Sequence, residues 1–313
     1  MTLQQLEYVV ALDNHRRFSA AAEECHVAQP SLSAALHKLE EELGVKLFDR
    51  SRQPIVPTEL GKPFIQQARR VLRETDALRY LVSDHVESHS GEFRLGIIPT
   101  LAPYLLPLFL KDFSEKSPQI KLHIHERTTE NLLALLKREQ LDAVLLATPA
   151  EEDVFVKDCL FYEEFVAYAP HEASILEKRF LLTEDIDPHR LVLLEEGHCL
   201  RNQVVNLCAL QKSQSGWSNI AYEAGSLETL RRLVENHSGI TILPQLAVLD
   251  LDEDQMQYVR FFQAPAPVRE ISLLTHPHFA KRKLLAALKE SIMANLPGFL
   301  REEKKVKRVL EIG

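Results

Sequence analysis

The 313-residue sequence has no apolar run near 18 residues and lacks the N-terminal pattern of a secretion signal. These absences argue against a membrane span or export, so we expect a cytoplasmic protein. It has only four cysteines, Cys25, Cys159, Cys199 and Cys208, and no pair has zinc-type spacing. We therefore predict no metal site and no cofactor. In a reducing compartment any disulfide would be transient rather than structural.

An excess of positive charge is also missing. The formal net charge is -8, and residues 1–62 hold seven Lys and Arg against nine Asp and Glu. This balance excludes a broadly basic nucleic-acid-binding domain, so any DNA contact must come from local placement of positive charge. Hydrophobic residues make up 45% of the chain and charged residues 26%. At this length, that composition indicates a globular protein of two or three domains.

Helical patterns open the chain. Apolar residues at helical intervals predict a helix over Leu3–Leu12, a second over Ser19–Cys25 and, after a short break, a third from Pro30 to about Leu43. Two helices joined by a four-residue turn are typical of a helix-turn-helix, whose second helix presents its N-terminal residues to the major groove. An ordinary helical bundle has the same spacing, and these residues alone leave both interpretations open.

A hairpin and a long helix should follow. Two short extended runs lie between residues 44 and 58, and they predict a wing with Arg50 and Arg52 placed to meet phosphates or a minor groove. Residues 58–89 carry apolar side chains every three or four positions, which predicts one long helix that pairs with a second subunit. Pro63 should bend its first turn, and residues 88–91 should form a hinge.

From Glu92 onward, strands and helices alternate. The predicted strands are 93–98, 120–126, 141–146, 165–168, 191–194, 220–222 and 240–243, and the predicted helices are 103–115, 130–138 and 227–235. This alternation predicts two α/β subdomains with parallel sheets, in which ligands bind beyond the carboxyl ends of the strands. A mixed-charge surface helix is expected at 299–310.

Two cysteines lie close together in the chain. Apolar spacing from Arg201 predicts a short helix, with Cys199 just before its start and Cys208 on its buried face. The helix N-terminus, Arg201 and His198 would favour the thiolate of Cys199, the candidate nucleophile, and Cys208 is the candidate resolving thiol. A helix holds their α-carbons about 13 Å apart, whereas a disulfide needs about 4.4 to 6.8 Å, so bonding would require unwinding. The alternative is that both are small buried hydrophobes.

Two threonines follow predicted strands, as does the segment that reaches Cys199. If these loops converge, Thr100 and Thr129 can donate to and accept from a small polar oxidant that Cys199 attacks. The alternative for each threonine is a helix cap, which Thr129 before Glu130 would suit.

Several motifs of the N-terminal third occur together: Phe18-Ser-Ala-Ala-Ala, Gln29-Pro-Ser-Leu-Ser, Leu43-Gly, Leu47-Phe-Asp-Arg and Thr58-Glu-Leu-Gly. They resemble the winged helix-turn-helix of LysR-type transcriptional regulators. The resemblance implies that a set of polar and basic residues faces DNA. These are Gln29, Pro30, Ser31, Ser33, Arg50 and Arg52.

Further motifs extend this likeness along the chain: Gly96-Ile-Ile-Pro-Thr, Glu196-Gly-His-Cys-Leu-Arg, Ser226-Leu-Glu-Thr-Leu-Arg and Gly239-Ile-Thr-Ile-Leu-Pro. They are similar to the peroxide-sensing members of the same family. The resemblance implies an α+β multi-domain fold, with a winged helix-turn-helix at 1–58, a linker and dimerisation helix at 59–90 and an α/β regulatory domain at 91–313. Two subdomains resembling periplasmic binding proteins would form that domain, at about 91–164 with 268–313 and at about 165–267.

The resemblance also implies roles and partners. Cys199 would be the peroxidatic thiol and Cys208 the resolving thiol, and the residues that line or tune the site would be Thr100, Thr129, His198, Gln203 and Arg269. Hydrogen peroxide would drive a disulfide that remodels the regulatory domain and activates antioxidant genes, and glutaredoxin or thioredoxin would reduce it. Implied partners are double-stranded DNA, RNA polymerase and further copies of the chain in a dimer of dimers, with no membrane. The resemblance thus implies a peroxide-sensing regulator that is not an enzyme. Two alternatives to this interpretation remain: a regulator gated by a small metabolite in the same cleft, and a thiol peroxidase.

Overall fold

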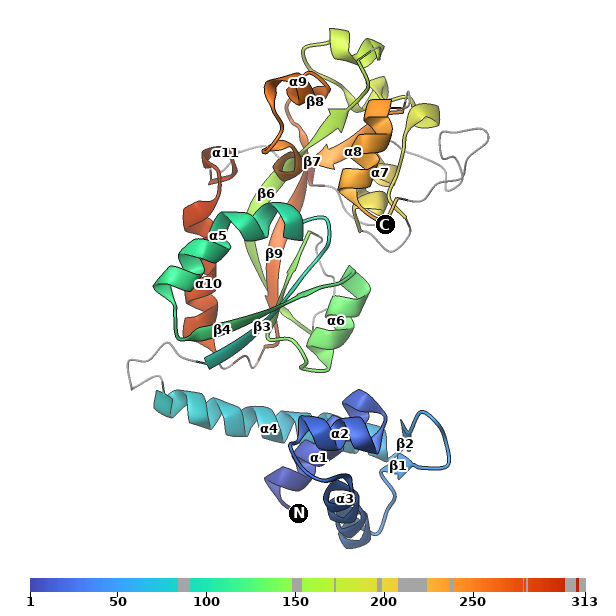
Figure 1. Cartoon of the computed structure of the whole chain (residues 1–313), viewed down its shortest axis with the longest axis vertical. Coiled ribbons are helices and arrows are strands. Elements are labelled where there is room, and N and C mark those ends of the chain that lie inside the picture. Colours follow the sequence, from blue (N-terminus) through green and yellow to red (C-terminus); the bar gives the residue numbers. More distant parts are fainter. Residues whose placement is uncertain are drawn as a thin grey trace. The chain divides into compact units, whose positions relative to one another are not determined.

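The computed structural model describes residues 1–83, 91–147, 154–171, 173–195, 199–207, 224–236, 239–277, 279, 281–301 and 308–309. The chain divides into an N-terminal helical unit and a C-terminal α/β unit (Figure 1). Within these residues, no helix combines the length and the apolar character needed to cross a membrane.

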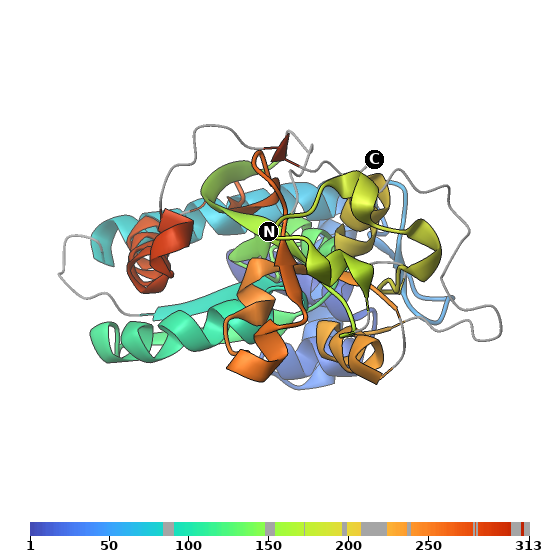
Figure 2. The same ribbon diagram turned by 90° about the horizontal axis from the view of Figure 1, so that it is seen from above.

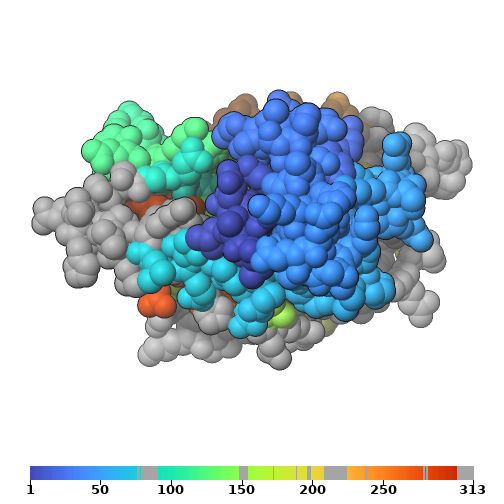
Figure 3. All heavy atoms as spheres, turned by 90° about the horizontal axis from the view of Figure 1, so that it is seen from below, coloured from blue at the N-terminus to red at the C-terminus, as the bar shows by residue number. Residues whose placement is uncertain are grey.

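The N-terminal unit has the predicted order of helices and a hairpin. Its elements are α1 (Leu3–His15), α2 (Phe18–Glu24), α3 (Gln29–Leu43), β1 (Phe48–Asp49), β2 (Val56–Pro57) and α4 (Gly61–Ser83). The strands β1 and β2 pair antiparallel, as a wing should. Leu12, Leu32, Leu36 and Leu39 fill the core, which confirms the apolar face expected of α3. Figure 3 shows the outer surface of this unit in blue.

The helix α4 begins three residues later than predicted. The Thr58 hydroxyl accepts a hydrogen bond from the Gly61 amide at 2.9 Å and so caps the helix from outside. Pro63 therefore lies in the first turn, where its missing N–H needs no partner, and this explains why a proline is tolerated there. The predicted continuation of this helix beyond Ser83 and residues 88–90 of the hinge predicted at 88–91 lie outside the described residues, and Gly91, the last residue of that hinge, is the first residue of β3.

The C-terminal unit is built on one mixed sheet. Its strands are β3 (Gly91–Ile97), β4 (Ile120–Glu126), β5 (Ala143–Leu146), β6 (Val156–Tyr168), β7 (Thr241–Pro244), β8 (Val259–Phe261), β9 (Pro267–Thr275) and β10 (Arg308–Val309). The order is β4-β3-β5-β9-β6-β7, with β10 beside β9 and β8 beside β6. Only the pairs β3–β4, β3–β5 and β9–β10 are parallel among these strands. The expectation of purely parallel sheets was therefore wrong.

Two long strands cause this difference. The strand β9 was not predicted, and β6 is 13 residues long where only its last four were expected. The two run antiparallel from Val156↔Thr275 to Glu164↔Val268, after which β6 pairs with β7 and β8 instead. They thus connect two lobes of the unit, as the ribbon shows (Figure 1). Below, the lobe of β3, β4 and β5 is called subdomain I, and the lobe of β7 and β8 is called subdomain II.

Helices cover both faces of the sheet. Those of subdomain I are α5 (Ala102–Lys116), α6 (Thr129–Lys137) and α10 (Arg282–Asn295), and those of subdomain II are α7 (Cys199–Leu207), α8 (Leu227–Asn236), α9 (Glu253–Met256) and the 3-10 helices η1 (Ser174–Glu177), η2 (Thr183–Asp185), η3 (Pro188–Arg190) and η4 (Gln245–Val248). The Ser291 hydroxyl of α10 donates to Asp112 of α5 at 2.8 Å, so these helices lie side by side (Figures 1 and 2). On the other face α6 packs closely, because a side chain at Gly96 would meet Leu132.

Three other expectations need comment. Residues 191–194 form isolated parallel bridges, Leu191↔Ile240 and Leu194↔Ala224, rather than a strand. The strand expected at 220–222 lies outside the described residues. The helix expected at 299–310 was wrong: α11 (Gly298–Arg301) is short, and residues 308–309 form β10 against β9. A charged, helix-favouring composition could not reveal that this segment pairs with a strand.

Candidate functional site

Three loops of subdomain I leave the same edge of the sheet. The strand β3 lies between β4 and β5 and runs parallel to both, so the carboxyl ends of all three meet there. Thr100 follows β3, Thr129 follows β4 and begins α6, and Ala147 follows β5. The Arg127 amide donates to the Ile97 carbonyl at 3.2 Å and holds the first two loops together. This edge is the floor of the candidate site.

The helix α7 of subdomain II contacts this edge at two points. Cys199 is its first residue, and the cysteine sulfur lies 2.6 Å from the Thr129 hydroxyl oxygen. Gln203 is fully buried and donates from its side-chain nitrogen to the Ala147 carbonyl at 2.8 Å. Cys199 and Gln203 are four residues apart, so they share one helix face. The two contacts lie at the ends of β4 and β5, and Thr100 comes from the strand between them.

Thr129 is the first residue of α6 and does not occupy its N-cap position. Thr128 occupies the N-cap position of α6 without a side-chain capping bond to a helix amide, and its hydroxyl accepts from the Asn131 side chain at 2.9 Å. Thr129 is therefore free of the capping role, and its hydroxyl is hydrogen-bonded to Cys199. A hydroxyl can donate to a thiolate, and the N-terminal end of α7 adds partial positive charge beside the same sulfur. The Thr129 hydroxyl and the N-terminal end of α7 therefore meet at the same sulfur.

Thr100 is bound by a buried arginine. Arg269 on β9 donates from Nη1 to the Thr100 hydroxyl oxygen at 3.2 Å and from Nη2 to the Thr100 carbonyl at 3.1 Å. Its Nε donates to the Glu163 carboxylate on β6 at 2.7 Å, and both charged side chains are 0% exposed. Glu163 was missed by the sequence analysis. The only signal was a pair of glutamates, 163 and 164, directly before the apolar run that ends the strand.

The structure leaves other predicted residues apart from this cluster or undescribed. His198 and Cys208 lie outside the described residues. Arg201 donates to the Leu194 carbonyl at 2.7 Å and so ties α7 to that residue. Cys25 belongs to the N-terminal unit, where burial and then the carboxylates of Glu24 and Glu7 raise its pKa to about 11.

The predicted DNA-facing residues lie at one end of α3 and on the wing. The side chains of Gln29, Pro30 and Ser31 are exposed in the first turn of α3, and Ser33 is half-buried. No side chain caps this helix end, and Ala28 precedes it. Pro30 has no backbone N–H, and the Ser31 amide donates to the Ala28 carbonyl at 3.0 Å, so this helix end presents mainly its polar side chains to solvent, an arrangement that suits contacts with DNA.

The two wing arginines differ. Arg52 is 71% exposed and pairs loosely with Asp49 at 3.2 Å. Arg50 is 29% exposed, donates to the buried Glu40 carboxylate at 2.8 Å and stacks 5.3 Å from the Phe18 ring centroid. Arg50 therefore holds the wing to α3 and α2, whereas Arg52 points its charge toward solvent.

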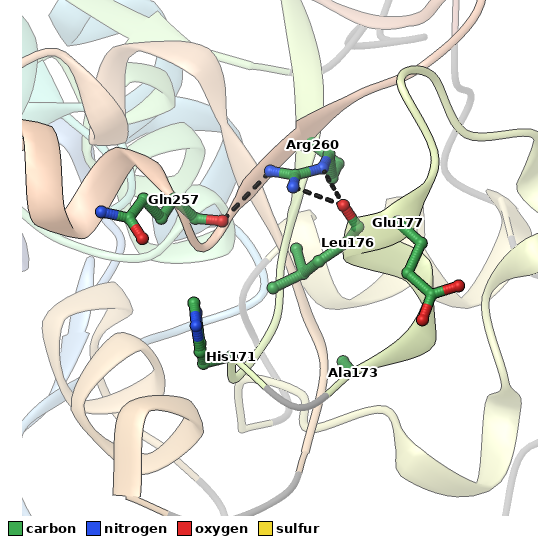
Figure 4. A pocket seen from close by; sticks show the side chains of 6 residues that line it. All are labelled: His171, Ala173, Leu176, Glu177, Gln257 and Arg260. Carbon is green, nitrogen blue, oxygen red and sulfur yellow. Dashed lines mark hydrogen bonds between the residues drawn. The ribbon is translucent and has the colours of Figure 1, made fainter.

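A separate cavity of about 500 Å³ lies at the far end of subdomain II. The residues that line it are His171, Ala173, Leu176, Glu177, Gln257 and Arg260 (Figure 4). The Arg260 guanidinium donates to the backbone carbonyls of Leu176 and Gln257, so its hydrogen-bonding capacity is largely used by the protein itself. No strand-end loop of the candidate site contributes to this cavity. Among the described residues, no group of three His, Cys, Asp or Glu side chains could hold a metal ion.

Comparison with known proteins shows the same two-part organisation. Residues 3–62 match the bacterial regulatory helix-turn-helix proteins of the lysR family, and residues 87–297 match the LysR substrate binding domain. The chain is 37% identical over 299 residues to the DNA-binding transcriptional dual regulator OxyR of Escherichia coli (strain K12), covering 95% of this chain and 97% of that protein.

Solved structures agree. A full-length cysteine-to-aspartate variant of OxyR from Pseudomonas aeruginosa is similar at a TM-score of 0.80 and 32% identity, covering 95% of this chain and 99% of that one. A cysteine-to-serine variant of Corynebacterium glutamicum OxyR with hydrogen peroxide bound is similar at a TM-score of 0.61 and 28% identity, covering 94% and 92%.

Proposed function

Because the chain belongs to the LysR family of bacterial transcriptional regulators, we propose that it is a cytoplasmic regulator that senses hydrogen peroxide through Cys199. The observation that carries the proposal is the contact between the Cys199 sulfur and the Thr129 hydroxyl across the two subdomains. This places the thiol at a helix N-terminus, against an edge of polar strand-end residues. A small polar oxidant is the kind of ligand that such a site can hold.

The reaction follows from these groups. The Cys199 thiolate attacks one peroxide oxygen, a sulfur–oxygen bond forms, and the oxygen–oxygen bond breaks. The sulfur is oxidised to a sulfenic acid, and the second oxygen leaves as hydroxide, which takes a proton and becomes water. The Thr100 oxygen already accepts from Arg269, so its own O–H remains available to donate to the departing oxygen. Thr129 orients the attacking sulfur.

A disulfide would turn this chemistry into a conformational signal. The nine residues of α7 rise about 12 Å from Cys199 to Leu207, and a sulfenic acid at one end cannot reach Cys208 while the helix persists. Condensation of Cys199 with Cys208 releases water and requires α7 to unwind. Leu200, Val204 and Leu207 would then leave the subdomain II core, so the two redox states cannot share one packing.

The N-terminal unit supplies the output. We propose that α3 enters the major groove with Gln29, Pro30, Ser31 and Ser33, and that Arg52 contacts the backbone. Copies of the chain would pair through α4, because a two-fold symmetric operator needs two DNA-reading units. Two such pairs would assemble as a dimer of dimers. Repacking of the regulatory domains would change the spacing between these heads and the contact with RNA polymerase. Glutaredoxin or thioredoxin would restore the thiols.

The deciding experiment is mass spectrometry of thiols after a brief, substoichiometric peroxide pulse, paired with DNA footprinting. We expect a 199–208 linkage and an altered footprint, and neither in the Cys199→Ser variant. A dominant product at Cys25 or Cys159 would contradict the site assignment. If Cys199→Ser kept a normal peroxide response, or if a metabolite shifted the footprint instead, the regulator would be ligand-gated. Steady peroxide turnover driven by a reductant, without DNA binding, would indicate a thiol peroxidase.

A further inference from the structure

One carboxylate at the junction of the two subdomains has no part in the reaction described so far. Glu163 lies on β6, two residues before the strand exchanges β9 for β7 and β8 as its partners. Its side chain is 0% exposed. One carboxylate oxygen accepts from Arg269 Nε at 2.7 Å, and the other accepts from the Leu246 amide at 2.8 Å. Both oxygens are therefore engaged by the protein interior.

The arginine passes this restraint to the site. Arg269 uses Nε on Glu163 and its two terminal nitrogens on Thr100, at 3.2 Å to the hydroxyl oxygen and 3.1 Å to the carbonyl. A guanidinium is planar, so fixing Nε fixes the direction of Nη1 and Nη2. Glu163 thus sets the position of the Thr100 hydroxyl through Arg269, without contacting Thr100 itself.

The same carboxylate also contacts subdomain II, through the Leu246 amide. Leu246 is the second residue of η4, which follows β7, whereas Thr100 follows β3 of subdomain I. Glu163 accordingly joins η4 to the Thr100 loop through the bond from the Leu246 amide, the ion pair with Arg269 and the two bonds from Arg269 to Thr100. The buried guanidinium needs acceptors for its terminal N–H groups, and the acceptors here are the hydroxyl and carbonyl oxygens of Thr100, a residue of the proposed oxidant site. The same bonds that satisfy Arg269 therefore set the geometry of that site.

We infer that Glu163 is a positioning residue for the reaction of Cys199 with peroxide, acting through Arg269 on the Thr100 hydroxyl. The inference rests on the proposed function. It adds that the geometry of the oxidant site depends on a carboxylate at the subdomain junction. Peroxide needs an aligned donor for its departing oxygen, whereas a simple alkylating reagent such as iodoacetamide needs only the thiolate. The two reagents therefore separate positioning from general damage.

The test compares both reagents on the full-length chain with Cys208 replaced by Ser, so that only the first step is followed. In Glu163→Gln we expect the peroxide rate of Cys199 to fall about tenfold or more, with iodoacetamide alkylation and its pH profile changed less than about twofold. The control is Glu270→Gln, because the Glu270 carboxylate binds Lys157 and Ser272 instead. It should leave both rates within about twofold.

Each outcome has one meaning. A parental peroxide rate in folded Glu163→Gln would overturn the inference, and so would an equal loss with both reagents, which would mark a purely structural residue. If Glu163→Gln does not fold, Glu163→Asp carries the same test, because it keeps the charge but shortens the reach to Arg269. If the parent chain itself reacts with peroxide no faster at Cys199 than at Cys159, the proposed function fails, whatever Glu163 does.

Discussion

Each unit of the protein contains a glutamate–arginine pair built on the same plan. In the N-terminal unit, Glu40 accepts from Arg50 at 2.8 Å, and in the regulatory unit Glu163 accepts from Arg269 at 2.7 Å. Both glutamates also accept backbone N–H groups of a neighbouring segment. The two pairs differ in how far solvent reaches the arginine: Arg50 is 29% exposed, whereas Arg269 is 0% exposed.

This difference in exposure determines what the loss of one partner does to each pair. In the wing, Glu40 holds the amides of Leu47 and Phe48 at 2.8 and 3.2 Å, and Arg50 can turn to solvent if it loses its partner. At the junction neither partner can be rehydrated, so removing one leaves a buried charge. The arginine there also binds the site. The wing pair thus only stabilises the local structure of the hairpin, whereas the junction pair contributes both to stability and to the geometry of the site.

The largest effect is expected when the junction pair is broken. Glu163→Ala should lower the free energy of unfolding by about 3–5 kcal/mol, because Arg269 stays buried without its carboxylate. Urea unfolding of the full chain, with hydrogen exchange to locate the loss in the regulatory unit, measures it. Glu126→Ala on exposed β4 is the control and should change little. A loss no larger than the control's would show that Arg269 finds water or another partner.

Breaking the wing pair should cost less. Glu40→Ala leaves the Leu47 and Phe48 amides without their acceptor, and we expect a loss of about 2 kcal/mol in the N-terminal unit. Because the wing is then released, DNA affinity should fall too, as measured by fluorescence anisotropy. The neighbouring Glu41→Ala, with an exposed carboxylate, should leave both quantities unchanged. Unaltered stability in Glu40→Ala would mean that the hairpin holds itself.

The two wing arginines should separate fastening from DNA contact. Arg50→Met should cost about 1 kcal/mol or less of stability, because Arg50 is partly exposed and the Glu40 carboxylate keeps the Leu47 and Phe48 amides as partners. Arg52→Met should not change stability but should lower DNA affinity and reduce the slope of log affinity against log salt by about one. The reverse pattern would show that Arg50 is the phosphate contact.

The sequence predicted the elements that show one clear period. The helices α1, α3, α5 and α6 and the strands β3 to β5 have one apolar face or an apolar run, and all were expected near their observed bounds. The strand β9 was missed because all nine residues are buried, so no alternation marks it, and they include Arg269 and Glu270. Missing it also hid the antiparallel pairing with β5 and β6.

The site divides in the same way. The meeting of Thr129 with Cys199 could be expected, because the sequence predicted a strand before each of them and loops that follow strands can converge. Glu163 could not, since its partner lies 106 residues away on a strand that the pattern did not reveal. A glutamate in a strand normally indicates a solvent-facing position. Only the tertiary structure shows that this one is paired inside the protein.

The smallest effect is expected at the cysteine of the N-terminal unit. Burial, followed by Glu24 and Glu7, raises the pKa of Cys25 from an ordinary 9.0 to about 11. Near neutral pH its thiol should therefore resist both peroxide and iodoacetamide, and Cys25→Ser should leave the oxidation rate of Cys199 unchanged. Alkylation of Cys25, followed by mass spectrometry, should rise only as the pH approaches about 11.

The stability linked to this neutral thiol is complete below about pH 9 and is lost as the pH rises toward 11. Rapid labelling of Cys25 near neutral pH would contradict this prediction, because the half-buried thiol of the N-terminal unit would then be as reactive as Cys199.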